Sequence, residues 1–345
     1  MINAPRSICI VRLSAMGDVL MLVPLIRTLQ TYYTNTLLTW IISRPAYDLV
    51  EGMDGIEFIV IDKPENPLDY WRFQQRMKNR KFDVLIAAQS SFRANLLYAC
   101  LRAKRKIGYD SLRAKDGHGF FINERISPGN DHTLEGFLKF AQALGIPEQE
   151  IRFDLPHTKL DDDWAMEHIP YASEPLMLVN PAASKPERAW LVDRYIAVIK
   201  HMQNRWHARV VLVGGPGEHD RVLGQEIEAA TGVQNLIGQT KPKQLLSVLR
   251  LADVLLCPDT GPSHMATAVG TAVVALHAVT SSDVSGPYMH RHLSVDYYPE
   301  AVTQVLRKTM KTNVWGTHAH GMDTMKLIPV EAVIRQLDRV FSDLS

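Results

Sequence analysis

The chain has 345 residues, of which 46% are hydrophobic and 22% are charged. This composition is that of a globular protein and excludes the disordered and fibrous classes, and the length favours two domains over one. Lys and Arg number 38 against 37 for Asp and Glu, so the net charge of +1 argues against nucleic acid as a partner.

The cysteines and the apolar runs indicate the compartment. Cys9, Cys100 and Cys257 are widely spaced and lie among apolar residues, which indicates packed, reduced thiols and neither a disulfide framework nor a zinc site. The longest apolar run, residues 19–26, is far shorter than the roughly 20 residues that a spanning helix needs. The N-terminus runs directly into a strand from Ser7, unlike a signal peptide. We therefore expect a cytoplasmic protein, which could still work at a membrane surface.

Short apolar runs alternate with helical segments along the first half of the chain. These runs are residues 7–13, 37–43, 57–62 and 82–89, and a helix through Leu29 follows the first of them. Alternation of this kind predicts a parallel sheet covered by helices on both faces.

The composition of the sequence changes after Asp154. Prolines and an acidic cluster mark a connection between domains that flanks a short helix. Asp161, Asp162 and Asp163 contain a D-x-D pattern typical of a metal site, but their position before a helical segment favours an acidic helix start.

A second alternating series fills the rest of the chain. Its apolar runs are residues 175–181, 208–218, 253–259 and 271–278, with helices expected at residues 191–206 and 329–344. The pattern predicts an α/β protein of two doubly wound domains, residues 1–165 and 166–345, and the final helix could pack back toward the N-terminal domain. In such folds the loops at the carboxyl ends of the strands bind ligands.

The loop after the first strand is a candidate ligand site. Gly17 permits a close backbone approach, and Asp18 lies at the start of the following helix. A carboxylate at this position is either a helix cap or a catalytic base, and the local sequence favours the cap slightly.

The turn after the run at residues 253–259 is a stronger candidate. Asp259, Thr260, Gly261 and His264 surround the start of a helix, where free backbone N–H groups suit a phosphate. A purely structural turn could use Asp, Gly and Pro, but it would not need the Thr and the His as well.

Two further loops of the second half carry weaker signals. Lys185 and Arg188 follow one strand and could neutralise a leaving diphosphate, although on this loop alone solvated charges are the better interpretation. Gly214, Gly215 and Glu218 follow the next strand, where an acidic side chain could accept hydrogen bonds from a ribose.

A basic stretch, residues 93–115, contains seven cations and one acid, Asp110. Such clustering in a neutral protein indicates an anionic partner or a solvated helix face.

In this order the loops resemble those of the bacterial lipopolysaccharide heptosyltransferases, glycosyltransferase family nine. The most specific segments are LSAMGDVL at residues 13–20, SKPERAW at 184–190 and DTGPSHMA at 259–266, and LRAKRKIGYD at 101–110 adds to them. The resemblance implies the GT-B architecture of two Rossmann-like domains facing across a cleft. It also implies inverting transfer without a cofactor or an obligatory metal.

The same resemblance implies a role for each domain. The N-terminal domain would bind the acceptor, the Kdo or heptose of the lipid A inner core, at the cytoplasmic face of the inner membrane, with Asp18 as the catalytic base. The C-terminal domain would bind the donor, ADP-L-glycero-D-manno-heptose. The implied donor contacts are Ser184, Arg188, Glu218, Asp259, Thr260, Gly261 and His264, and the expected acceptor contacts are Ser14, Arg93, Arg105, Lys106 and Arg113.

The sequence departs from the family at two loops. Residues 278–283 replace a Gly-Pro-Thr type of loop, and residues 181–183 lack hydroxyl groups that some members have. Another GT-B transferase with a different nucleotide sugar is therefore an alternative. A nicotinamide-dependent oxidoreductase is disfavoured because no G-x-G-x-x-G motif follows either first strand, and a non-catalytic binding protein is disfavoured because Asp18 and Arg188 are both present.

Overall fold

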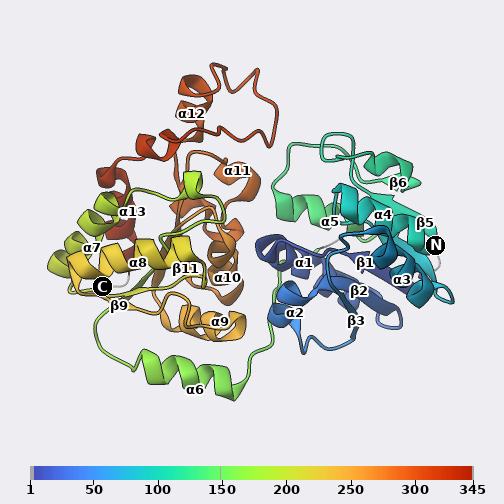
Figure 1. Cartoon of the computed structure of the whole chain (residues 1–345), viewed down its shortest axis with the longest axis horizontal. Helices are drawn as coiled ribbons and strands as arrows, with labels where there is room; N and C mark the ends of the chain where they lie inside the picture. Colours follow the sequence, from blue (N-terminus) through green and yellow to red (C-terminus); the bar gives the residue numbers. More distant parts are fainter. Residues whose placement is uncertain (1–3, 148, 344–345) are drawn as a thin grey trace. The chain divides into compact units, whose positions relative to one another are not determined.

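The computed structural model describes residues 4–147 and 149–343, and it divides the chain into two compact units, Met1–Pro156 and His157–Ser345 (Figure 1). The division falls before helix α6, Lys159–His168, which packs against α9, Pro242–Leu251, of the second unit. The sequence placed the boundary after residue 165, inside this helix. The short helix expected in the connection is confirmed, and Asp161 caps it by accepting from the Thr158 N–H at 3.3 Å.

The first unit is built on a parallel six-stranded sheet in the order β3-β2-β1-β4-β5-β6. Its strands are β1 Ser7–Val11, β2 Leu37–Ser43, β3 Ile56–Ile61, β4 Lys81–Ile86, β5 Arg102–Gly108 and β6 Glu124–Arg125. The strands β1 and β4 lie at its centre. β1 is buried from Ile8 to Val11 and β4 from Val84 to Ile86, which explains why these residues are apolar. Two strands were not foreseen: β5 lies within the basic stretch, and β6 has two residues.

Helices cover both faces of this sheet. They are α1 Met16–Tyr32, α2 Arg44–Val50, α3 Pro67–Met77, α4 Phe92–Cys100 and α5 Thr133–Ala143, with a short 3-10 turn η1, His118–Phe120. Helix α3 begins at an Asn66 cap that accepts from the N–H groups of Leu68 and Asp69. Helix α1 is buried along most of its length and packs against α5.

The second unit repeats the same plan. Its parallel sheet has the order β12-β11-β10-β7-β8-β9. Its strands are β7 Leu176–Val179, β8 Arg209–Leu212, β9 Gln234–Asn235, β10 Val254–Pro258, β11 Ala272–His277 and β12 Val295–Asp296. If β7 is counted as the first strand, this order is the same 3-2-1-4-5-6 as in the first unit, which is the topology of dinucleotide-binding folds. The expected doubly wound α/β organisation is confirmed.

The helices of the second unit, besides α6 and α9, are α7 Val192–Trp206, α8 Glu218–Thr231, α10 Gly261–Val269, α11 Ser282–Ser285, α12 Tyr298–Gln304 and α13 Val330–Ser342. Short 3-10 turns lie at η2 Pro186–Arg188, η3 Tyr288–Leu293 and η4 Thr324–Leu327. Helix α13 packs against α7, β11 and β12. Leu344, the end expected for this helix, lies outside the described residues.

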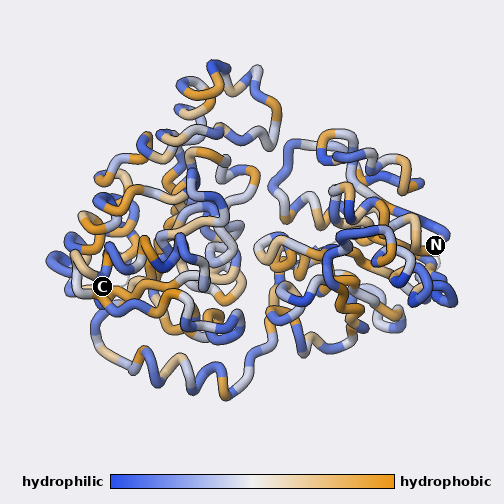
Figure 2. The backbone as a smooth tube through the Cα atoms, viewed as in Figure 1, coloured by the Kyte–Doolittle hydropathy of each residue, from blue (hydrophilic) through white to orange (hydrophobic). Residues whose placement is uncertain are grey.

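Apolar side chains from both faces of each sheet form the cores, and the central strands appear hydrophobic in Figure 2. Two of the cysteines, Cys9 and Cys257, are buried in central strands, and Cys100 is half-buried at the end of α4. All three thiols are free, as the sequence predicted. Burial raises the pKa of each of them, which makes the reactive thiolate scarce.

Candidate functional site

Each unit has one point where the strand order reverses, and this point locates its candidate site. In the first unit the reversal lies between β1 and β4, and in the second between β7 and β10. Helices leave the two neighbouring strands toward opposite faces there, so their carboxyl ends open into a crevice that binds ligands in this class of fold. The candidate residues Asp18, Arg188 and Asp259 all follow one of these four strands.

In the first unit an arginine spans the reversal point. Arg12 directly follows β1, and its Nη1 donates to the Ala88 carbonyl at the end of β4 over 2.8 Å. Its Nη2 forms an ion pair with Asp18. The guanidinium also lies 5.4 Å from the centre of the Phe137 ring. Burial by itself would lower the pKa of Arg12, but Asp18, Tyr109 and Tyr98 together outweigh it, so the pKa is raised and the side chain stays charged.

Asp18 lies in the first turn of α1. Its carboxylate accepts from the Ala15 N–H at 3.2 Å, which is the capping contact that the sequence suggested. The side chain nevertheless remains 30% exposed, so capping leaves the carboxylate open to a second ligand. Ser14 lies partly exposed in the same loop. The sequence missed Arg12 as the partner of Asp18, although a charged residue directly after a buried strand was a usable signal.

The loops that follow β4 and β5 join this edge of the sheet. The Leu13 N–H donates to Gln89 Oε1 at 2.8 Å, which ties the β1 loop to the β4 loop. Ser90 Oγ in turn accepts from the Lys115 N–H at 2.5 Å, which ties the β4 loop to the β5 loop. Arg93, at the start of α4, is exposed beside these loops. Asp18 in the first turn of α1, Ser14 in the loop before it and Arg93 in the first turn of α4 therefore lie at the same edge of the sheet.

The other cations of the predicted acceptor set have partners inside the unit. Arg105 donates to both carboxylate oxygens of Glu124, at 2.8 and 2.7 Å, from the middle of strand β5. Lys106 Nζ donates to the Tyr98 carbonyl at 2.9 Å. These two side chains are engaged along β5 and not in the loops at its carboxyl end.

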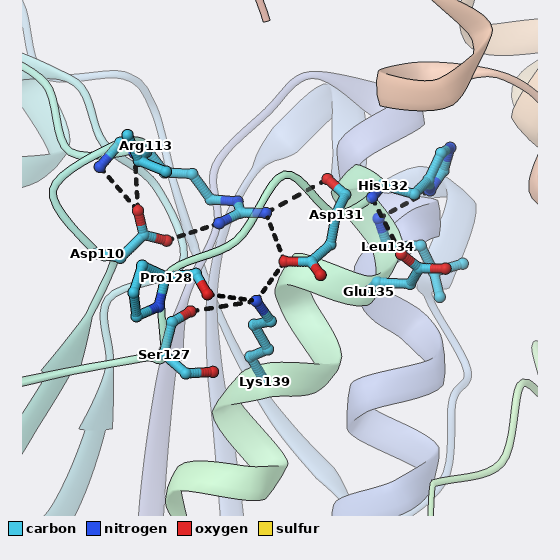
Figure 3. Close-up of polar contacts among 10 residues, drawn as sticks. Asp110, Arg113, Ser127, Pro128, Asp131, His132, Leu134, Glu135 and Lys139 are labelled. Carbon is cyan, nitrogen blue, oxygen red and sulfur yellow. Dashed lines mark hydrogen bonds and ion pairs between the residues drawn. The ribbon is translucent and has the colours of Figure 1, made fainter. Parts of the chain in front are cut away.

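Arg113 lies beyond the end of β5 and is buried in the charged network of Figure 3. It donates to Asp110 Oδ2 at 2.6 Å and to Asp131 Oδ2 at 3.1 Å. Lys139 of α5 also contacts Asp131 and donates to the Ser127 carbonyl at 3.2 Å. Burial would raise the pKa of Asp131, but Lys139 and Arg113 lower it below its usual range. The network therefore holds the β5 loop against α5.

In the second unit another arginine spans the reversal point. Arg188, in the turn η2 after β7, lies with its Nη1 3.5 Å from Asp259 Oδ2 at the end of β10. Both side chains are largely buried, at 15% and 11% exposure. The structure thus brings two of the predicted donor contacts together, although they are far apart in the sequence.

Asp259 is the centre of a polar cluster. Thr280 Oγ1 donates to its Oδ2 at 2.7 Å. Burial would raise the pKa of Asp259, but His277, His264, the Thr280 hydroxyl and Arg188 together lower it, so the carboxylate is charged. Thr280 belongs to the loop in which this sequence departs from the family pattern, and sequence reasoning did not assign it a contact.

Thr260 precedes α10 at its N-cap position, and the helix begins at Gly261. His264, one turn into the helix, is buried. The N–H groups at the start of this helix and the charge of Arg188 across the turn make the site attractive to an anion.

Arg188 has a second neighbour that the sequence did not suggest. Its Nη2 donates to Nδ1 of His318 at 3.3 Å, so His318 is neutral in this arrangement. Desolvation and the charge of Arg188 lower the pKa of His318 to about 4. The next histidine, His320, pairs with Glu187 of η2 at 2.5 Å. Sequence reasoning had no signal for these contacts, because 130 residues separate Arg188 from His318.

The remaining donor candidates follow β7 and β8. Ser184 is exposed in the β7 loop, and Glu218 is the exposed first residue of α8. A Cβ at Gly214 would lie 3.2 Å from Oδ1 of Asn180, so glycine there lets the β8 loop approach the β7 loop closely. That Oδ1 is buried without a hydrogen-bond partner among the described residues.

The described residues contain neither a membrane-spanning helix nor a cluster of metal ligands. None of their helices is long and apolar enough to cross a membrane. Within residues 4–147 and 149–343, no group of three or more His, Cys, Asp and Glu side chains is arranged to hold a metal ion.

Comparison with known proteins adds sequence evidence. Residues 70–313 match the model of glycosyltransferase family 9 (heptosyltransferase). The lipopolysaccharide core heptosyltransferase OpsX of Haemophilus influenzae is 33% identical over 98% of both chains.

Solved structures show the same fold. The glycosyl transferase family 9 structure from Veillonella parvula superposes with a TM-score of 0.79 at 17% identity, over 98% of this chain and 97% of that one. The E. coli heptosyltransferase WaaC, solved with ADP, gives a TM-score of 0.72 at 16% identity, over 97% and 99% of the two chains. The expected GT-B type of α/β architecture is confirmed.

Proposed function

The chain belongs to glycosyltransferase family 9, the heptosyltransferase family, and from this premise we propose that it transfers heptose from ADP-L-glycero-D-manno-heptose to the inner core of lipopolysaccharide. The full-length likeness to a lipopolysaccharide core heptosyltransferase carries this proposal. The acceptor is a Kdo or heptose hydroxyl of the lipid A-linked core, presented at the cytoplasmic face of the inner membrane.

The second unit binds the donor. The charge of Arg188 and the N–H groups at the start of α10 receive the diphosphate, and the Asp259 cluster fixes the arginine beside this helix end. Glu218, exposed at the start of α8, accepts hydrogen bonds from the ribose. Ser184 and Thr260 supply hydroxyl groups, and the absence of a side chain at Gly261 admits the phosphates.

The first unit binds the acceptor and supplies the base. Asp18 takes the proton of the attacking hydroxyl while that oxygen forms a bond to the anomeric carbon. The bond from this carbon to the β-phosphate oxygen breaks in the same step, ADP leaves with the electron pair, and the configuration inverts. Arg188 and the helix N-terminus stabilise the developing charge on ADP, so the proposal needs no metal. Arg93 and Ser14 contact the acceptor from the edge that carries Asp18, while Arg113 acts on it through the β5 loop that it holds against α5. Arg105 and Lys106 are engaged along β5 and take no direct part in acceptor binding.

Thermal unfolding with a panel of nucleotides tests the donor half of this proposal. ADP, UDP, GDP and NAD are added separately at one concentration. A ligand present at 100 times its Kd stabilises the native state by about 2.7 kcal/mol, which gives a visible shift. A shift with ADP alone supports the proposal and leads to a transfer assay with ADP-heptose and Kdo-lipid A. A preference for UDP or GDP contradicts the heptose donor, and a response only to NAD contradicts the transferase assignment.

A further inference from the structure

Three large apolar side chains are exposed on the first unit around the loop between β5 and η1. Phe120 is 91% exposed, Phe92 is 63% exposed and Leu112 is 53% exposed. Scattered exposed apolar residues need no explanation, but three on hydrogen-bonded neighbouring segments, which we call the patch, are a candidate binding surface.

The three residues belong to one hydrogen-bonded framework. The Phe92 N–H donates to the Asp116 carboxylate at 3.0 Å, which joins the start of α4 to the loop that carries Leu112. The Phe120 N–H donates to the Gly117 carbonyl at 2.9 Å, one residue further along that loop. Because these contacts join the backbone of both segments, the two phenylalanines are held on neighbouring segments of the surface.

The hydrogen bonds of a buried histidine stabilise this framework. His118 is 1% exposed, and its Nδ1 contacts Asn95 Oδ1 at 2.7 Å. Its Nε2 accepts from the Tyr109 N–H at 3.1 Å, and Asn95 Nδ2 donates to the Asp116 carbonyl at 2.9 Å. The exposed aromatic residues therefore extend from an ordered base, and their exposure does not result from a frayed loop.

Cations surround the patch. Arg93 and Lys115 are exposed directly beside Phe92 and within the same loop as Leu112. A Cβ built on Gly119 would lie 2.5 Å from Nη2 of Arg125, so this third exposed cation lies next to the residue that precedes Phe120. The nearby acid, Asp116, is engaged with the Phe92 N–H.

The patch also lies at the edge of the sheet that carries the proposed base. The β4 loop, which leads into Phe92, accepts from Arg12 through Ala88 and from the Leu13 N–H through Gln89. Arg12 in turn is paired with Asp18. A lipid-anchored acceptor bound near Asp18 would therefore have its membrane close to this patch.

We infer that Phe92, Leu112 and Phe120, with Arg93, Lys115 and Arg125, form a docking surface for an anionic lipid bilayer. The inference rests on the proposed function, because only a lipid-anchored acceptor requires such docking. The aromatic rings enter the boundary between headgroups and acyl chains, and the cations pair with lipid phosphates. Each basic residue near an anionic membrane strengthens binding by roughly fivefold.

Sedimentation with vesicles tests the surface. The full chain is mixed with vesicles of phosphatidylglycerol and phosphatidylethanolamine, or with phosphatidylcholine alone, at low and high salt. We expect binding to the anionic vesicles, weaker binding to phosphatidylcholine, and a loss as salt rises. The double variant F92S/F120S should bind at least about tenfold more weakly, because two apolar rings no longer enter the bilayer.

Tyr171→Ser is the matched control. Tyr171 is 98% exposed and belongs to the second unit, so its replacement removes an exposed ring that is not part of the proposed surface. The control should bind vesicles as the unmodified chain does. Unchanged melting temperature and ADP affinity in F92S/F120S would show that the variant is folded.

Several results would overturn the inference. The first two are an absence of vesicle binding and equal binding to the two kinds of vesicle. The third is an equal loss of binding in F92S/F120S and Y171S. The fourth is binding to native inner-membrane vesicles that is abolished when the vesicles are first treated with protease, which would indicate a protein partner. Failure of the proposed function has a different signature. A chain that binds anionic vesicles through this surface but shows no response to ADP contradicts the donor assignment and leaves the docking surface intact.

Discussion

The guanidinium of Arg12 holds Asp18 by one terminal nitrogen and the Ala88 carbonyl by the other. One buried side chain thus connects the proposed base to the end of the neighbouring strand, at the point where the strand order reverses. In the second unit Arg188 reaches Asp259 between the equivalent strands, β7 and β10. In both sheets, therefore, an arginine from the loop after the first strand positions a carboxylate at the reversal point.

Asp18→Asn should abolish most turnover while the fold persists. The amide keeps the size of the side chain but cannot accept the proton of the acceptor hydroxyl, and a positioned base typically contributes about 10²–10⁴-fold. We expect kcat to fall by that factor with ADP affinity unchanged, as measured by steady-state kinetics and by calorimetry with ADP. An unchanged kcat would remove Asp18 from the mechanism.

Arg12→Lys tests whether the arginine positions the base. Lysine keeps the charge but lacks the planar fork that reaches Asp18 and Ala88 together. We expect kcat to fall by about 10- to 100-fold, the typical cost of a misplaced reacting group. The loss of stability should be only about 1 kcal/mol, because the Tyr109 hydroxyl still donates to the Ala88 carbonyl.

The control for Arg12→Lys is a double-mutant cycle with Asp18→Asn. If Arg12 acts through Asp18, its replacement should have little further effect on kcat in the D18N background. Additive losses from the two substitutions would mean that Arg12 acts elsewhere.

Arg188→Gln should weaken ADP binding and spare adenosine. A hydrogen bond to a charged group contributes about 1.5–3 kcal/mol, so the Kd for ADP should rise by about 10- to 100-fold. Adenosine lacks the diphosphate, and its affinity should not change. Lys200→Gln, an exposed position on α7, is the matched control for loss of one positive charge. Equal losses for ADP and adenosine would indicate that the substitution disrupts the whole site.

Chelation should leave turnover unchanged. Arg188 and the N-terminus of α10 supply the stabilisation that a metal would otherwise give to the departing diphosphate. We expect the transfer rate in excess EDTA to equal the rate without it, with donor and acceptor held at fixed concentrations. A sharp loss that Mg²⁺ or Mn²⁺ restores would contradict the metal-free scheme.

The buried His118 predicts a dependence of stability on pH. Burial and the nearby charge of Arg125 lower its pKa to about 4, below the value near 6.5 of an unfolded histidine. As the pH falls, His118 therefore binds a proton more readily in the unfolded chain than in the folded chain. The resulting contribution of His118 to stability is complete above about pH 6.5 and is lost as the pH falls toward 4.

Urea unfolding between pH 7 and pH 4.5 measures the effect of His118. The unmodified chain should lose about 2 kcal/mol through this group, after allowance for solvent screening. His118→Gln should be less stable at pH 7 but show a shallower decline. Parallel curves for the two proteins would mean that His118 titrates normally.

Much of the architecture could be predicted because local hydrophobic patterns determine it. The apolar runs that became β1, β2, β4, β7 and β10 are buried strands, and their alternation with helices determines the doubly wound plan. Strand β5 was missed because lysines and arginines occupy most of its positions. Two of these side chains, Arg105 and Lys106, contact Glu124 and the Tyr98 carbonyl, partners that only the folded protein provides.

The sequence identified the candidate residues that follow strands, but it did not identify the residues that contact them. Asp18 lies in the first turn of the helix after β1, and Asp259 lies in the turn after β10, and the sequence reveals both positions. His318 reaches Arg188 across 130 residues, and no local pattern encodes such a contact. The cations between Arg93 and Lys115 looked alike in the sequence, but only some of them are exposed, because burial depends on the tertiary neighbours.

The inert thiols make the chain a convenient subject for spectroscopic labelling. Cys9 and Cys257 are sealed in the centres of the two sheets, so a thiol reagent should reach Cys100 at most. In a Cys100→Ala background, cysteines introduced at Leu37 and Tyr171, which are 74% and 98% exposed, would carry the only reactive groups. A pair of spin labels at these two positions, one in each unit, would then report how the distance between the units changes when ADP is added.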